Sequence, residues 1–243
     1  MALPGGSQAK EGTGVNGEVL LQGIVGSQAY GFAHEGSDID RLGLYAAPTS
    51  SFFGLGKPQE SYVTTKPDLT LHEAQKWCRL ALKCNPTAME LVWLPEGLYE
   101  VRHPLGDDLI AIRRSFLSAR AVRNSYLGYA SSQLSKLKHT AIKMDTHEDP
   151  AAVQDRRRKH ARHLVRLMLQ GVGLHQGDDL VVRLPSPGYV VETASAIVLD
   201  PRIGDMLLAG AEKVFDKTSQ LPEEPNTVVV EAWLHGVRRS FLE

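Results

Sequence analysis

The first hundred residues alternate apolar and polar positions in short runs, the pattern of β-strands with one buried face. Four runs show it: 19–25, 39–45, 61–65 and 69–71. Residues 71–82 change to apolar spacings of three and four, which predicts a helix. Asn85-Pro86 stops that helix and begins another, which should end before Pro95. This part of the chain is therefore expected to be a sheet flanked by helices.

Beyond residue 104 the apolar spacing is mainly helical. It predicts helices at 107–115, 118–143, 151–171, 205–218 and 227–242, and short strands at 180–184 and 189–192. The predicted fold class is α+β: a mixed sheet with flanking helices, then a basic helical region and a small mixed C-terminal part. We divide the chain into a flexible leader (1–16), a sheet domain (17–104) and a mainly helical domain with a small β element (105–243). The last of these should close a cleft against the sheet domain.

The net charge of -1 hides an uneven distribution. Residues 113–183 contain 14 Lys and Arg against 6 Asp and Glu, a surplus of 8, whereas the remainder contains 13 against 22, a deficit of 9. A basic middle beside an acidic first part suits a polyphosphate or nucleic-acid partner, although solvated charge on long helices gives the same count. No apolar run is long enough for a membrane, and Cys78 and Cys84 match no redox or zinc spacing. We therefore expect a cytoplasmic protein with two reduced thiols and no membrane partner.

Two carboxylates, Asp38 and Asp40, flank Ile39 at the start of the second predicted strand. Side chains two residues apart on a strand share a face, so both carboxylates should point to one place while Ile39 is anchored in the core. Two like charges held close together are costly unless a cation lies between them. The pair therefore predicts a divalent metal site.

Gly26-Ser27 ends the first predicted strand, where backbone N–H groups and the Ser27 hydroxyl can face phosphate oxygens. Alone the pair indicates only a tight turn. Followed by Ser37-Asp-Ile-Asp40, it resembles the signature of the DNA polymerase β-like nucleotidyltransferase superfamily. The resemblance implies a nucleotidyltransferase-type sheet, with Asp38 and Asp40 as metal ligands and catalytic residues. It also implies that Gly26, Ser27 and Ser37 contact a nucleoside triphosphate.

In that superfamily a third carboxylate comes from a neighbouring strand, and Asp68 is the candidate here. It precedes the apolar alternation at 69–71, so the resemblance makes it a third catalytic residue and metal ligand. Pro67 beside it is unusual for a central strand and predicts an edge or the start of a strand. The alternative is an ordinary Pro-Asp turn.

A closer resemblance is to the predicted nucleotidyltransferases associated with RNA-repair genes. It rests on Gly26-Ser-x-Ala-Tyr-Gly before Ser37-Asp-x-Asp-x-x-Gly-x-Tyr, and extends over about residues 23–183 through the segments 83–91, 128–130 and 159–167. It implies supporting roles for Asn85 and Glu90 in holding the nucleotide or the third strand. The local alternatives are a helix cap for Asn85 and a surface ion pair for Glu90.

Lys159, His163 and Arg166 share one face of a predicted helix, opposite an apolar stripe. If this helix borders the metal cleft, Lys159 and Arg166 neutralise triphosphate charge, and His163 bonds a phosphate or ribose oxygen. All three are then nucleotide-binding residues. A solvated basic face over a core-facing stripe gives the same pattern.

Together these features predict a nucleotidyltransferase that uses Mg2+, or Mn2+, in a two-metal mechanism with an NTP such as ATP as substrate. The expected acceptor is the hydroxyl at an RNA 3′ end, tRNA included, in RNA repair or processing. Tyr126 and Tyr129 are available to stack on bases, with core packing as the alternative. Two other functions stay open: transfer of AMP or another NMP to a protein or small-molecule hydroxyl, and RNA binding without catalysis.

Overall fold

The computed structural model describes residues 14–142 and 149–242. At its centre is a mixed five-stranded sheet, so the predicted α+β class is confirmed. Its strands are β1 (Glu18–Val25), β2 (Asp40–Ala46), β3 (Ser61–Thr65), β4 (Asp68–Glu73) and β5 (Tyr99–Arg102). They lie in the order β3-β4-β2-β1-β5, with β2 and β4 parallel and the other neighbouring pairs antiparallel.

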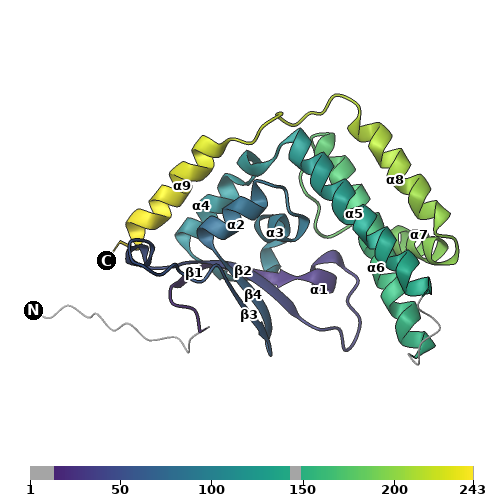
Figure 1. Cartoon of the computed structure of the whole chain (residues 1–243), viewed down its shortest axis with the longest axis horizontal. Helices are drawn as coiled ribbons and strands as arrows, with labels where there is room; N and C mark the ends of the chain where they lie inside the picture. Colours follow the sequence, from purple (N-terminus) through teal and green to yellow (C-terminus); the bar gives the residue numbers. More distant parts are fainter. Residues whose placement is uncertain (1–13, 143–148, 243) are drawn as a thin grey trace, which may run out of the picture.

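Short helices lie between the strands or directly after the last one, and longer helices follow (Figure 1). The short ones are α1 (Gly26–Tyr30), α2 (Ala74–Ala81), α3 (Pro86–Glu90) and α4 (Pro104–Ala111). The later ones are α5 (Ala119–Ile142), α6 (Pro150–His175), α7 (Pro187–Leu199), α8 (Arg202–Phe215) and α9 (Thr227–Ser240). Turns of 3-10 helix lie at Thr49–Phe52, Leu91–Trp93, Glu96–Leu98 and Arg113–Phe116.

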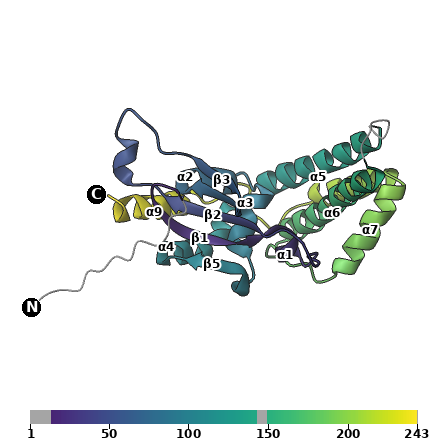
Figure 2. The same ribbon diagram turned by 90° about the horizontal axis from the view of Figure 1, so that it is seen from below.

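The helices α5 and α6 pack side by side and extend away from the sheet in both views (Figures 1 and 2). Their contact is made by apolar residues at helical spacing. Tyr126 and Leu134 on α5 are buried, as are Ala161 and Leu164 on α6. Gly171 lets α6 approach closely, because a Cβ there would lie 2.7 Å from the Cβ of Tyr126. The α5–α6 pair is thus a closely packed unit that extends from the sheet.

The end of the chain returns to the sheet. Arg238 on α9 donates to both carboxylate oxygens of Glu73, at 2.7 and 3.1 Å. The indole N–H of Trp233 donates to the carbonyl oxygen of Leu105 at 2.8 Å. One buried apolar cluster includes residues on both sides of residue 104. The division of the chain at residue 104 stays a prediction, and the core is continuous across it.

The two strands predicted in the tail are wrong. Residues 180–184 have no regular structure, residues 189–192 lie in α7, and the described residues after Pro104 contain no strand. In α7, Val190, Ala194 and Ile197 are buried at helical spacing, and the helix packs against α6. This tertiary packing overrides the local β preference of the Tyr-Val-Val segment.

Two smaller differences lie in the first part of the chain. Residues 71–73 belong to β4 and not to the following helix, because β4 continues in register with β2 as far as Glu73. The short strand β5, which pairs with β1, was not predicted. Of the predicted leader, residues 1–13 lie outside the described residues.

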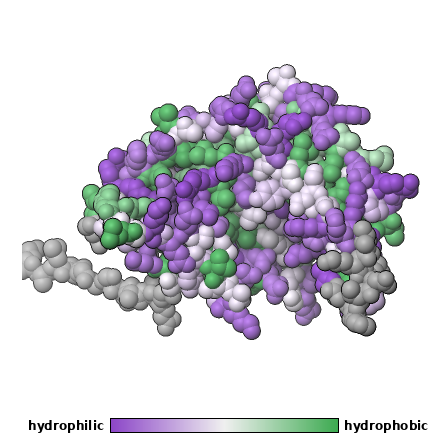
Figure 3. All heavy atoms as spheres, viewed as in Figure 1, coloured by the Kyte–Doolittle hydropathy of each residue, from purple (hydrophilic) through white to green (hydrophobic). Residues whose placement is uncertain are grey.

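Hydrophilic residues cover most of the face seen in Figure 3, and hydrophobic residues form small separate groups on it. Among the described residues, no helix combines the length and the apolar character needed to cross a membrane. Cys78 and Cys84 are free and buried, and burial raises the pKa of these thiols to about 12 and about 11.

Candidate active site

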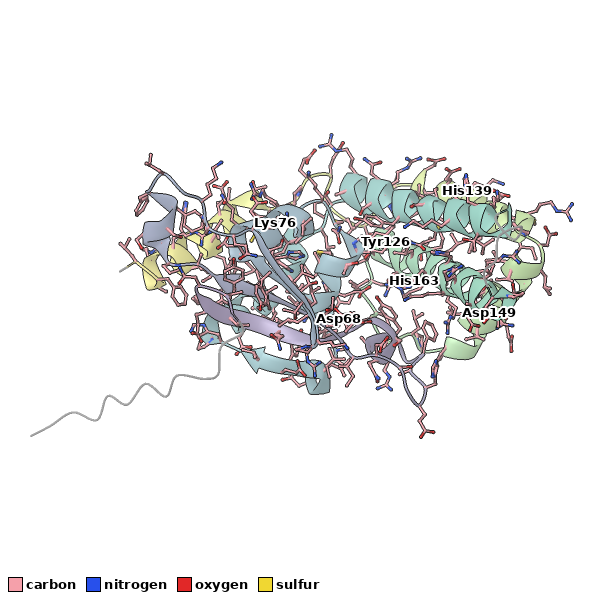
Figure 4. All side chains as sticks on the ribbon, turned by 60° about the horizontal axis from the view of Figure 1, so that its bottom comes forward. Asp68, Lys76, Tyr126, His139, Asp149 and His163 are labelled. Atoms are coloured by element: carbon pink, nitrogen blue, oxygen red, sulfur yellow. The ribbon has the colours of Figure 1, made fainter. Side chains whose placement is uncertain are left out.

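A cavity of about 580 Å3 lies between one end of the sheet and α6. This volume is typical of small-molecule sites. One wall comes from α1, the loop before β2, and the first residues of β2 and β4. The other wall comes from α3 and α6. Figure 4 shows Asp68 on the sheet side of this region and His163 on the α6 side.

Asp38, Asp40 and Asp68 all line the cavity. In the parallel register Arg41 pairs with Leu69, so Asp40 and Asp68, each one residue earlier, begin neighbouring strands side by side. Burial raises the pKa of Asp40, and the negative charges of Asp68 and Asp38 raise it further. Within the described part of the chain, the three carboxylates form neither hydrogen bonds nor ion pairs. Their charge is therefore available to a ligand in the cavity.

The expected anchoring of Ile39 in the core is wrong. Its side chain is 44% exposed, because β2 begins at Asp40 and Ile39 still belongs to the preceding loop. Asp38 therefore reaches the cavity from the loop, whereas Asp40 reaches it from the strand. The two carboxylates meet through the shape of the loop and not through alternation along one strand.

Gly26 begins α1 with φ at 67°, a left-handed backbone that glycine adopts without strain. A Cβ at this position would collide with Oδ2 of Asp40. Glycine therefore allows the turn to lie directly against the carboxylate. The next residue, Ser27, lines the cavity. Ser37 also lines it, but its hydroxyl accepts a hydrogen bond from the His34 N–H at 2.9 Å and so helps to close the loop.

The α6 wall carries Lys159, Arg162 and His163. Lys159 is exposed, and its positive charge lowers the pKa of Asp40 against the effects that raise it. The Arg162 guanidinium carbon lies 5.9 Å from the centre of the Phe32 ring. Burial, with help from neighbouring cations, lowers the pKa of His163 to about 3. Its ring is therefore neutral near pH 7 and has one N–H to donate to a ligand oxygen.

Arg166, predicted to contact a nucleotide together with Lys159 and His163, does not line the cavity as those two residues do. Its side chain is buried, forms an ion pair with Glu90, and donates to Oε1 of Gln170 at 2.9 Å. Its guanidinium carbon also lies 4.1 Å from the centre of the Tyr30 ring. Arg166 is about two helical turns beyond Lys159. At that level α1 and α3 cover α6, so a shared helical face does not mean a shared cavity.

Glu90 is wholly buried and contributes to the cavity lining, so the surface ion pair considered for it is wrong. The Tyr30 hydroxyl donates to its two carboxylate oxygens at 2.7 and 2.9 Å. Burial raises the pKa of Glu90, whereas the Arg166 charge and the Tyr30 hydroxyl stabilise the carboxylate. Glu90 thus joins α1, α3 and α6 behind the cavity.

Asn85 caps α3, as its alternative interpretation proposed. Its Oδ1 accepts from the Ala88 N–H at 3.1 Å, and its Nδ2 donates to the Tyr129 hydroxyl at 2.6 Å. Asn85 does not line the cavity. Tyr126 is buried in the core, which excludes it from base stacking, whereas Tyr129 is 42% exposed.

The carboxylates suit a hard cation such as Mg2+, which prefers oxygen ligands. Among the described residues, no three His, Cys, Asp or Glu side chains lie close enough together to hold a metal ion by themselves. Mg2+ usually binds through one or two carboxylates together with waters and substrate phosphates. Burial first, and then the negative charges of Asp68 and Asp38, raise the pKa of Asp40, and a bound cation would counter both effects. The residues therefore fit a metal site that is completed by a bound substrate.

Sequence reasoning missed Thr70 and His72, which line the cavity from β4. They follow Asp68 at steps of two, so alternation along this strand is a signal that places all three on one face. His72 Nδ1 lies 2.8 Å from the Ser61 hydroxyl, and burial lowers the pKa of His72. Tyr30 was missed for another reason: its partner Glu90 is 60 residues away in sequence, and no local pattern connects them.

Comparison with known proteins now adds to this geometry. Residues 7–187, well over half of the chain, match the family model described as the RNA repair pathway DNA polymerase beta family. The chain belongs to this family. It is thereby a member of the polymerase β-like nucleotidyltransferases linked to RNA repair. The matched span includes the carboxylate wall and the α6 wall of the cavity.

Among solved structures, a nucleotidyltransferase-like protein from Exiguobacterium sibiricum 255-15 is similar at 15% sequence identity. The similarity covers 92% of this chain and 74% of that chain, with a TM-score of 0.32. No curated protein matches the chain.

Proposed function

We propose that this protein transfers a nucleoside monophosphate from a nucleoside triphosphate to the 3′-terminal hydroxyl of an RNA. The observation that carries the proposal is one cavity with basic residues on one wall and three carboxylates, unpaired within the described chain, on the other. Membership of an RNA-repair family of nucleotidyltransferases supports RNA as the acceptor.

Asp38 and Asp40 are the residues that would hold Mg2+ or Mn2+, with Asp68 on the acceptor side of the same site. A bound divalent ion supplies Lewis-acid activation of the acceptor hydroxyl and neutralises phosphate charge, as in two-metal nucleotidyl transfer. Because these carboxylates lie side by side without partners among the described residues, they are free for that purpose.

The remaining residues position the triphosphate. The Gly26-Ser27 turn offers its N–H groups and a hydroxyl to phosphate oxygens. Lys159 and Arg162 balance phosphate charge, and neutral His163 donates its ring N–H to a phosphate or ribose oxygen.

In the transfer, the acceptor oxygen bonds to the α-phosphorus, and the bond from the α-phosphorus to the oxygen that bridges it to the β-phosphorus breaks. Diphosphate leaves with the electron pair, and the hydroxyl proton passes to the Asp68 carboxylate and then to solvent.

The test is incubation with each α-phosphate-labelled NTP, Mg2+ and three separate acceptors. These are an RNA with a free 3′ hydroxyl, the same RNA ending in a 3′-deoxynucleotide, and a mixture of folded proteins. We expect label only on the first RNA, and none when the divalent ion is chelated. Label on protein contradicts the RNA acceptor, and no incorporation with any acceptor contradicts nucleotidyl transfer.

Replacement of the carboxylates tests the site itself. Asp38→Asn and Asp40→Asn are each expected to lower transfer by at least about 100-fold, the range lost when an essential catalytic group is removed. The matched control is Asp205→Asn, which removes an exposed carboxylate on α8 that pairs with Lys138 at 2.8 Å. Full transfer activity in Asp38→Asn or Asp40→Asn would contradict the proposal.

A further inference from the structure

A second cavity, of about 430 Å3, adjoins the first. His34, Lys159 and Arg162 line both, so the two cavities lie next to each other along these side chains. The second lies between α6 and α7. Figure 4 shows the direction in which it leads: Asp149 lies farther out along α6 than His163, on the side away from Asp68. We call this second cavity the α6–α7 groove.

One wall of the groove is a basic stripe of α6. It consists of Asp155, Arg156, Arg158, Lys159 and Arg162. Residues 155, 158, 159 and 162 are spaced by three and four and so lie on one helical face. This lining contains four cationic side chains and one carboxylate. The first cavity, in contrast, contains the carboxylates.

The one carboxylate of this lining, Asp155, binds its partner Arg158 only weakly. Arg158 donates to Asp155 at 3.0 Å, and both side chains are more than half exposed. An exposed ion pair of this kind contributes little free energy, so Arg158 can exchange Asp155 for a phosphate at small cost. The wall is thus a ready binding surface for a polyanion.

The opposite wall, from α7, has no charged group within the described lining. It presents Val191, Ala194 and Ser195, again at a helical spacing. Val191 is partly exposed, and the Ser195 hydroxyl donates to the Val191 carbonyl oxygen at 2.8 Å. Small uncharged side chains leave room for sugars and bases, and they offer little that could distinguish one base from another.

We propose that the α6–α7 groove holds the sugar-phosphate backbone of the single-stranded RNA whose 3′ end enters the first cavity, an inference that rests on the proposed function. From Arg156 to His163 the helix rises about 10 Å. That distance matches about three nucleotides at the roughly 3.4 Å spacing of a stacked strand. Because cations that contact phosphates carry no sequence information, binding in the groove is independent of sequence.

The competing use of these cations is to bind the triphosphate. Lys159 and Arg162 line both cavities and serve either purpose, whereas Arg156 and Arg158 line only the groove. The double variant Arg156→Gln/Arg158→Gln therefore separates the two uses. Its matched control is Arg120→Gln/Arg123→Gln, which removes two exposed arginines of α5 that pair with Glu224 and Asp216.

The experiment measures direct binding of a labelled twelve-nucleotide RNA by fluorescence anisotropy, without NTP, over a series of salt concentrations. For Arg156→Gln/Arg158→Gln we expect the Kd to rise about tenfold and the slope of log K against log salt to fall by about 1.4, at about 0.7 for each phosphate that an arginine no longer neutralises. The effect should shrink for a dinucleotide, and the Kd for NTP should not change. The control variant should bind RNA as the wild type does.

Three results overturn the inference: an equal loss in the control, an equal loss for NTP or dinucleotide, or tight binding of an acidic peptide that depends on the same arginines. Because binding is measured without NTP, failure of the proposed function is seen separately. Wild-type protein that binds RNA through Arg156 and Arg158 but transfers no label supports the groove and refutes the transfer.

Discussion

Two groups of polar and charged side chains, one lining the first cavity and one packed behind it, lie in opposite surroundings. The open group is Asp38, Asp40 and Asp68, which form no hydrogen bond or ion pair within the described chain and face the cavity. The closed group is Tyr30, Glu90 and Arg166, which are buried and bonded to one another. Unbalanced charge costs free energy and attracts a ligand, whereas balanced buried charge fixes the elements that carry it. The open group is thus suited to binding, and the closed group to holding α1, α3 and α6 in place.

The largest expected effect on stability comes from removing one charge of the closed group. Arg166→Met leaves the Glu90 charge buried without its partner and should lower the free energy of unfolding by about 3–5 kcal/mol. Without Arg166 the pKa of Glu90 rises further, so the folded form takes up a proton more readily. The loss should therefore be smaller at low pH and grow as the pH rises through that pKa. Urea denaturation at several pH values measures both.

The control for Arg166 is Arg202→Met. Arg202 pairs with Asp200 on the surface at 2.8 Å and is mostly exposed, so its loss should change the free energy of unfolding far less than the loss of Arg166 does. Similar losses for the two variants would show that the Glu90–Arg166 pair has no special stabilising role. Glu90→Gln in the Arg166→Met background should recover stability, because the unpaired charge is then absent.

Removal of a charge from the open group should have the opposite effect on stability. Because the folded state raises the pKa of Asp40, this carboxyl favours folding below its unfolded pKa, and that contribution is lost as the pH rises through the folded pKa. At pH 7 Asp40→Asn should therefore raise the Tm in the absence of metal while transfer falls about 100-fold. Added Mg2+ should raise the Tm of the wild type and of Asp205→Asn more than that of Asp40→Asn. A lower Tm for Asp40→Asn would place Asp40 among the stabilising residues.

The contact between Gly26 and Asp40 allows a smaller and more specific test. Gly26→Ala should lower the free energy of unfolding by about 1–3 kcal/mol through backbone strain, and its Cβ should also displace the Asp40 carboxylate. Gly36→Ala is the control. Gly36 also has a positive φ, 84°, but a Cβ there would have no atom within 4 Å, so this variant introduces the backbone strain without the collision. The Tm, measured by thermal unfolding, and the rate of NTP-dependent transfer should therefore both be lower for Gly26→Ala than for Gly36→Ala. Equal losses in the two variants would mean that the close approach to Asp40 is unimportant.

The same contrast explains which parts of the site the sequence could predict. Gly26, Asp38 and Asp40 lie within fifteen residues of one another, and Asp68 follows on the strand that neighbours β2, so a local pattern sufficed. The closed group has no such pattern, because Glu90 is 60 residues from Tyr30 and 76 from Arg166. These bonds exist only once α1, α3 and α6 have packed together.

The errors in the predicted secondary structure have the same physical origin, which is contact between segments far apart in the sequence. The Tyr-Val-Val segment at 189–191 favours a strand locally, but packing of α7 on α6 makes it helical. Ile39 follows an apolar alternation in the sequence, yet the strand begins one residue later. Periodicity predicted the elements well and could not predict where pairing with a neighbour starts or stops.

His163 lies between the two groups, and its expected effect is on the pH dependence of stability. It lines the cavity, and its ring makes an edge contact with Tyr30, with 6.3 Å between ring centres. Burial lowers its pKa in the folded state to about 3, so folding keeps it neutral. Its contribution to stability is present above the unfolded pKa of about 6.5 and is lost as the pH falls toward the folded pKa.

The test compares the wild type with His163→Gln by urea denaturation at pH 7.5 and pH 5. Between these values the wild type should lose about 2 kcal/mol more than the variant, because protonation of the unfolded histidine no longer contributes in the variant. Transfer by the wild type should show no change in rate from titration of this ring between pH 5 and 8. If the two proteins lose stability equally, His163 titrates normally and its charge belongs with the ligand-binding wall. If the expected difference appears, His163 is kept neutral by burial, as the closed group is kept in balance by its own bonds, although His163 also lines the cavity.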